Sequence, residues 1–126
     1  MYKVELENRG EMFFIAKSKD YLFNIDLKGK GMNPPDVFLA SLAGCIGVYF
    51  RKYLESAKLE ISGFKITAEG EFTQEAPYRF SKIKISIDIK ETHLEEKRKS
   101  AIMEFIKNCP LHNTLKYPPE INLEIF

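Results

Sequence analysis

Cysteine occurs only twice in the sequence, and we expect neither a signal peptide nor a membrane-spanning hydrophobic run. Two cysteines are too few for the disulfide framework of a small secreted domain. The longest uncharged run, residues 37–50, is shorter than the roughly 18 apolar residues that a membrane span needs. The start of the chain lacks the basic residues and the apolar stretch of a signal peptide. We therefore expect a cytoplasmic protein without a membrane partner.

Neither sign of charge is in excess. The chain has 19 Lys and Arg against 18 Asp and Glu, a formal net charge of +1. No basic stripe is present, so nucleic acid is not an expected partner. A length of 126 residues, 44% of them hydrophobic, is typical of one globular domain, which we place at residues 1–126.

Several motifs of thiol and metal chemistry are also missing. No C-x-x-C occurs, which argues against a thioredoxin site and a zinc knuckle. Cys45, Cys109, His93 and His112 would make four zinc ligands, but no two of them have ligand spacing. Nothing in the sequence specifies a papain-like Cys–His pair. We expect no metal and no cofactor.

Three short strands are predicted before the first helix. Tyr2–Glu7 alternates apolar and polar residues, the period of a half-buried strand. Two similar segments follow at Glu11–Lys17 and Tyr21–Leu27. The residues between them, 8–10 and 18–20, are typical of turns.

A helix is predicted from Asn33 to about Ala57. Asn33 suits the N-cap, Pro34 the first helical position, and Asp36 the positive end of the helix dipole. The first three turns are apolar on every side. This pattern predicts a central helix that is covered on most sides.

The second half of the chain predicts two longer strands, a helix and a last strand. Between Ile83 and Ile89, isoleucine alternates with polar residues, as in a strand with one dry and one wet face. Thr92 and Glu95 have the spacing of a capping box. The predicted elements are strands at Glu60–Phe72, Tyr78–Lys90 and Ile121–Phe126, and a helix from Thr92 to Pro110 with an inner stripe of Leu94, Ala101, Ile102, Phe105, Ile106 and Cys109. The order βββαββαβ indicates an α+β fold with mostly antiparallel sheets covered by helices.

The two thiols have two interpretations. Both lie on apolar helix faces, and free cysteine is among the most buried residue types, so both fit a hydrophobic core. The alternative is a reactive site. Gly44 and Gly47 flank Cys45, and each costs about 1 kcal/mol of helix stability relative to alanine, which makes sense if something approaches the backbone there. Pro110 ends the second helix, so that Cys109 borders a loop.

Two sequence blocks resemble the OsmC/Ohr family of osmotically inducible and organic hydroperoxide resistance proteins. "NPPDVFLASLAGC" is similar to the family's Asn/Ser-Pro, apolar helix and cysteine. "NCPLHNTL" is similar to its second signature, Cys-Pro-x-Ser-Asn-Thr-Leu. The predicted order of elements also resembles that of the family across nearly the whole chain.

The resemblance implies an intertwined homodimer, in which two strand layers flank the paired central helices, and thiol-dependent reduction of organic hydroperoxides. It implies that Cys45 is the peroxidatic thiol, that Cys109 resolves it, and that a dithiol reductant restores both. The family's N-terminal arginine is best matched by Arg9. We expect the apolar helix around Cys45 to favour an alkyl chain, through Phe38, Leu42, Ile46 and Tyr49.

One position departs from the family pattern. Aligning Asn33 and Cys45 puts Pro35 where the family has the glutamate that holds its arginine. Asp36 is adjacent but points about 100° away around the helix. Glu7 or Glu11 are possible substitutes from the hairpin that carries Arg9. The departure favours a second hypothesis, a non-catalytic OsmC-like domain that binds a small apolar ligand at the dimer interface.

Overall fold

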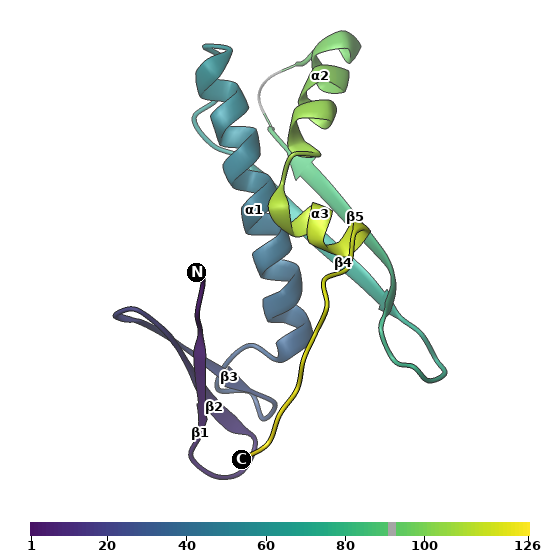
Figure 1. Ribbon diagram of the computed structural model, residues 1–126. Coiled ribbons are helices and arrows are strands. Elements are labelled where there is room, and N and C mark those ends of the chain that lie inside the picture. Colours follow the sequence, from purple (N-terminus) through teal and green to yellow (C-terminus); the bar gives the residue numbers. More distant parts are fainter. Residues whose placement is uncertain (91–92) are drawn as a thin grey trace. The chain divides into compact units, whose positions relative to one another are not determined.

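The computed structural model describes residues 1–90 and 93–126, which form two compact units, Met1–Phe38 and Leu39–Phe126. The first unit holds a three-stranded antiparallel sheet in the order β1-β2-β3 (Figure 1). Its three strands confirm the predicted ones, although each boundary is shifted by up to three residues. They span Glu5–Asn8 (β1), Phe13–Ser18 (β2) and Tyr21–Asp26 (β3).

The Asn8 side chain organises the turn between β1 and β2. Its amide nitrogen donates to the carbonyls of Glu11 and Phe13, both at 3.0 Å, and its oxygen accepts from the backbone N–H of Gly10 at 3.2 Å. Gly10 has a φ of 102°, a conformation that glycine adopts without steric cost. The tight turn predicted between these strands is therefore specified by two residues of its own sequence.

Helix α1 (Pro34–Ser56) begins where the sequence predicts. The Asn33 side chain accepts a hydrogen bond from the backbone N–H of Asp36 at 2.9 Å, which confirms the N-cap. The division between the two units falls in the first turns of this helix. Within the second unit, one face of α1 is buried at every fourth residue: Leu42, Ile46, Phe50 and Leu54.

The opposite face of α1 is open. Gly44 is exposed, and 53% of Val48 is accessible. The prediction that the helix is covered on most sides is therefore wrong for the single chain, because one chain supplies packing for only one face. By length and composition alone α1 could cross a membrane, but the core helix of a soluble protein has the same properties.

Strands β4 (Lys65–Phe72) and β5 (Phe80–Asp88) form an antiparallel pair and are shorter than predicted. The isoleucines of β5 pack against the core, as the alternation predicts. On the other face, Glu69 lies opposite Lys84 and Glu71 opposite Lys82, so that each cross-strand pair joins opposite charges.

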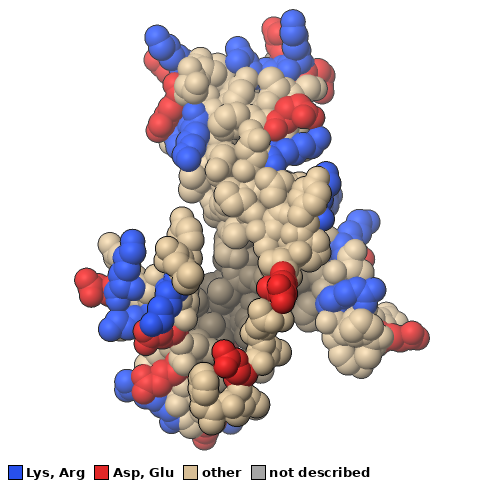
Figure 2. All heavy atoms as spheres, in the orientation of Figure 1, with Lys and Arg blue, Asp and Glu red and all other residues tan. Residues whose placement is uncertain are grey.

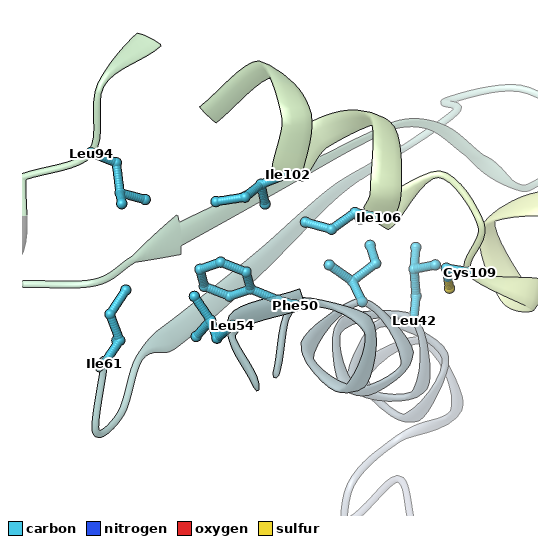
Figure 3. Close-up of a cluster of buried hydrophobic side chains, with 9 residues drawn as sticks. Leu42, Phe50, Leu54, Ile61, Leu94, Ile102, Ile106 and Cys109 are labelled. Atoms are coloured by element: carbon cyan, nitrogen blue, oxygen red, sulfur yellow. The ribbon is translucent and has the colours of Figure 1, made fainter. Parts of the chain in front are cut away.

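Helix α2 (Glu96–Ile106) starts later than predicted. Its N-cap is Glu95, which makes no side-chain capping bond, and Thr92 of the predicted capping box lies outside the described residues. Of the predicted inner stripe, Ala101 is exposed, whereas Leu94, Ile102, Ile106 and Cys109 are buried. Figure 3 shows Leu94, Ile102 and Ile106 on the side of Phe50 and Leu54 of α1, and Cys109 beside Leu42.

The structure differs from the prediction after residue 109. The sequence predicts a loop after Cys109, but Pro110 begins a further short helix, α3 (Pro110–Lys116). Proline is well suited to the first turn of a helix, so it ends α2 and starts α3. Within the described residues, Ile121–Phe126 forms no strand and its apolar side chains are exposed, because no strand edge of the single chain pairs with it.

Charge is unevenly distributed over the face in Figure 2. Lys, Arg, Asp and Glu gather over the end of α1 and the start of α2, with both signs mixed. The surface over α3 is mostly uncharged.

The antiparallel sheets and the helices on a sheet face confirm the predicted α+β class.

Candidate functional site

The second unit brings the two thiols together. Cys45 lies in the middle of α1, Cys109 lies between α2 and α3, and their Sγ atoms are 2.8 Å apart. Both are free thiols, because a disulfide bond is only about 2.05 Å long. The resolving role that the resemblance implies for Cys109 requires the two thiols to lie close in space, and in the structure they do. A small movement of the two sulfur atoms would allow a disulfide bond between residues that are 64 positions apart in the sequence.

Cys109 is held at a junction of two helices. Its backbone N–H donates to the carbonyl of Ile106 at 2.9 Å, and its own carbonyl accepts from the N–H of Asn113 at 3.0 Å. Its Sγ serves as the N-cap acceptor of α3 and receives the backbone N–H of His112 at 3.5 Å. The position of this thiol is therefore fixed by the end of one helix and the start of the next.

The two thiols differ in environment. Cys109 has no accessible surface, whereas Cys45 is half-buried. Burial raises the pKa of the Cys109 thiol, and its hydrogen bond to Cys45 raises it further, against smaller lowering effects from the N–H groups of His112 and Leu111. Cys109 therefore stays protonated at neutral pH, and Cys45 is the thiol that a reagent from solvent can reach.

The two glycines beside Cys45 have different surroundings. A Cβ on Gly47 would lie 3.2 Å from Cδ1 of Ile66, so this glycine lets α1 pack closely on β4. A Cβ on Gly44 would meet nothing within 4 Å. The prediction that both glycines make room beside the Cys45 thiol is wrong for Gly47, which instead allows the helix to pack closely on the sheet.

The predicted apolar pocket residues separate into three groups. Leu42 and Ile46 are buried and line a cavity of about 990 Å³. Tyr49 does not line it; its ring lies 6.0 Å from that of Phe105. Phe38 belongs to the first unit. Substrate binding by these four residues stays a prediction.

The arginines of the second unit are engaged elsewhere. Arg51 donates to the carbonyl of Ile61 at 2.9 Å and lies over the Phe64 ring. Arg98 donates to the Tyr53 hydroxyl at 3.1 Å, and Arg79 to the carbonyl of Pro77 at 2.7 Å. These contacts tie helices and turns together rather than serving a thiol.

Arg9 lies in the first unit, where its Nε is 3.4 Å from the Glu7 carboxylate. Both side chains are more than half exposed, which makes this a weak, screened ion pair. Glu7 is thus the hairpin carboxylate that contacts Arg9. The role of Arg9 toward Cys45 stays a prediction.

His112 is the site residue that the sequence reading left without a role. Its backbone N–H contacts the Cys109 thiol, and its side chain lines the cavity. Its position in "NCPLHNTL" is that of serine in the family signature, and this difference was the available signal. Among the described residues, no three His, Cys, Asp or Glu side chains gather as a metal site requires.

Similar proteins share this fold. A model of the OsmC-like protein family matches residues 27–124. A protein from Psychrobacter arcticus described as a putative osmotic stress induced and detoxification response protein has a TM-score of 0.80 at 19% identity, over 90% of this chain and 88% of that one. An OsmC-like protein from Mycoplasma pneumoniae has a TM-score of 0.79 at 18% identity, over 92% and 87%.

The organic hydroperoxide resistance protein OhrB of Bacillus subtilis has a TM-score of 0.68 at 18% identity, covering 94% of this chain and 92% of that one. No curated protein sequence matches significantly. Structural neighbours at these identities establish the fold, and the family model extends from residue 27, just after β3, to residue 124 and includes both cysteines. The chain belongs to the OsmC-like protein family.

Proposed function

We propose that the protein is a thiol-dependent peroxidase that reduces organic hydroperoxides through Cys45, with Cys109 as the resolving thiol. The observation that carries the proposal is the 2.8 Å separation of the two sulfur atoms. The description of the Bacillus subtilis neighbour as an organic hydroperoxide resistance protein supports the substrate class.

The proposed reaction begins at the more accessible thiol. The Cys45 thiolate attacks the peroxide O–O bond, takes one oxygen as a sulfenic acid and releases an alcohol after protonation. The sulfur of Cys109 then attacks Cys45 Sγ; the S–S bond forms, the S–O bond breaks, and water leaves with the Cys109 proton. A dithiol reductant finally reduces the disulfide to two thiols and is itself oxidised to a disulfide.

We propose that the working form is a cytoplasmic homodimer. The exposed face of α1, with open space at Gly44, and the unpaired apolar segment 121–126 support a second copy as the missing packing partner. An extended segment with apolar residues at alternate positions is suited to pairing with a sheet edge of another chain. Neither nucleic acid nor a membrane is a proposed partner.

The decisive experiment measures consumption of cumene hydroperoxide with a dithiol reductant. Wild type should turn over and Cys45→Ser should not; without the reductant, Cys109→Ser should consume about one equivalent and stop as a sulfenic acid. A dimedone adduct on Cys45 in Cys109→Ser identifies that intermediate. Equal turnover by wild type and Cys45→Ser would refute the proposal.

We propose that Arg9 is the cation that stabilises the Cys45 thiolate, and Arg9→Ala tests this role. The rate at which Cys45 reacts with peroxide should fall, while the free energy of unfolding should change by no more than about 0.5 kcal/mol, as for an exposed residue. Because Arg9 is held only by an exposed carboxylate, the wild-type rate should itself be modest. An unchanged rate would remove Arg9 from the mechanism.

The second candidate is a non-catalytic domain that binds a small apolar ligand. Pro35, at the position of the family's glutamate, favours it, as does the engagement of Arg51, Arg79 and Arg98 in structural contacts. Under this candidate, neither cysteine is oxidised by a stoichiometric amount of hydroperoxide within minutes. Mass spectrometry of the peroxide-treated protein decides between the two.

A further inference from the structure

The Cys109 thiol takes part in the secondary structure of the chain. Its Sγ is the N-cap acceptor of α3 and receives the backbone N–H of His112 at 3.5 Å. The N–H groups of Leu111 and His112 both lower the pKa of this thiol, against the larger effect of its burial, so both act on the sulfur directly. The first turn of α3 therefore closes on the same atom that contacts Cys45 at 2.8 Å.

Helix α3 has little other support. It has seven residues, all of them within the described part of the chain, and none of its side chains is fully buried. Leu111 and Leu115 are 38% and 45% exposed. A helix this short does not hold together in water through its backbone hydrogen bonds alone, so its cap has a large share in whether it forms. The stability of α3 is therefore sensitive to the state of one sulfur atom.

Formation of a disulfide changes what holds that sulfur. The two Sγ atoms must approach each other from 2.8 Å to the roughly 2.05 Å of an S–S bond, and the bond also requires a specific dihedral angle. The position of Cys109 Sγ is then set by a covalent bond to α1. Because sulfur is only a weak acceptor, its hydrogen bond to α3 is the weaker of the two attachments and is the one that gives way.

We infer that α3 is a redox-sensitive lid on the buried sulfur: the reduced Cys109 thiol caps it, and a disulfide between Cys45 and Cys109 loosens it, so that a dithiol reductant reaches Cys109. The inference rests on the proposed function only for the role of the reductant. Loosening of the helix requires only that the S–S bond forms, whatever the oxidant.

The reductant has a reason to attack Cys109 rather than the more accessible Cys45. Attack at Cys45 would expel Cys109 as a thiolate, and burial disfavours that charge. In attack at Cys109, the S–S bond breaks and Cys45 leaves as a thiolate, which takes a proton. The second thiol of the reductant then attacks the reductant's sulfur in the mixed disulfide and frees Cys109 as a thiol. Cys109 has no accessible surface in the reduced protein, so this route needs α3 to open.

Substitutions of Thr114 test the access of the reductant. Thr114 is exposed, and alanine and glycine there lose the same hydroxyl bond to the Pro110 carbonyl but differ in helix propensity. Oxidised Thr114→Gly should therefore be reduced by dithiothreitol roughly fivefold faster than oxidised Thr114→Ala, because its α3 opens more often. Equal rates would mean that the reductant does not wait for α3 to open, and would overturn the lid.

Hydrogen exchange tests the loosening itself. The full-length protein is compared in its reduced form and after diamide, which takes one electron and one proton from each thiol and is reduced to the hydrazine. The amides from His112 to Lys116 should exchange roughly fivefold faster in the oxidised protein, the effect of losing a helix cap, and those of α1 no faster. Equal exchange of α3 in both forms would overturn the inference. Since no peroxide is used, this result is independent of the peroxidase assay.

Variants separate the cap from the bond. Cys109→Ser keeps a capping oxygen but cannot form the bond, so its α3 should stay protected with or without diamide. Cys109→Ala has neither, and its α3 should exchange about as fast as in the oxidised wild type. Cys45→Ser keeps the Cys109 cap and is the matched control for diamide, which should not change its α3. Full protection of α3 in Cys109→Ala, or loosening by diamide in Cys45→Ser, would overturn the inference.

Discussion

At the scale of single residues, the two cysteines of the thiol pair differ in burial and therefore in reactivity. Cys109 is fully buried and donates to Cys45, and both effects hold its proton. A raised pKa in the folded state also means that the reduced protein loses stability as the pH rises above the ordinary thiol value of about 8.5 toward the folded-state value. Below that window, the contribution is fully present.

Replacing Cys45 by alanine separates the two causes. In Cys45→Ala the hydrogen bond is lost, so the pKa of Cys109 should fall, yet burial should keep it above the ordinary value. The measurement is the pH dependence of the ultraviolet absorbance of the thiolate, which needs no reagent to reach the buried sulfur, with unfolded protein in urea as the reference. An unchanged pKa in the variant would show that the contact between the sulfur atoms contributes nothing.

At the scale of elements, the sequence predicted what local pattern determines. The Asn33 cap and the alternating isoleucines of β5 are local signals, and both are present in the structure. The α3 helix was missed because Pro110 was read only as a helix terminator. The terminal strand at Ile121–Phe126 could not be decided locally, because a strand depends on the edge with which it pairs.

For the candidate site, too, the features that depend on contacts between distant residues could not be predicted from local pattern. The proximity of Cys45 and Cys109 depends on contacts between helices far apart in sequence, and only the family resemblance predicted it. The cationic lining of the cavity was not predicted at all. Its lysines are Lys90 after β5, Lys99 in α2, Lys107 just after α2 and Lys116 in α3, and each one alone resembles an ordinary solvated charge.

A glycine in β4 gives a test of element packing. A Cβ on Gly70 would overlap the Phe80 ring of β5, whereas a Cβ on Gly63 would meet nothing within 4 Å. We expect Gly70→Ala to destabilise the protein by about 1–3 kcal/mol and Gly63→Ala to have little effect. Urea denaturation of both variants measures the difference. Equal stabilities would mean that Phe80 moves aside without cost.

At the scale of the whole molecule, the open side of α1 distinguishes a single chain from a dimer. In an isolated chain, Gly44→Ala should stabilise the helix by about 1 kcal/mol, because alanine is the better helix former and no atom is near. If a second copy packs there, the same substitution should weaken association. Thermal unfolding and analytical ultracentrifugation over a range of concentrations report the two effects. Gly47→Ala, which faces Ile66, is the matched control.

The contact between two sulfur atoms also has a consequence for the unfolded chain. A bond between Cys45 and Cys109 would close a loop over 64 positions, and the chain-entropy relation assigns such a loop about 4 kcal/mol of stabilisation. The oxidised protein should therefore melt at a clearly higher temperature than the reduced one, and Cys109→Ser should show no such difference after the same treatment. Because reduction removes this constraint, the resistance of the protein to heat or to a protease would depend on whether it had recently been oxidised and not yet reduced.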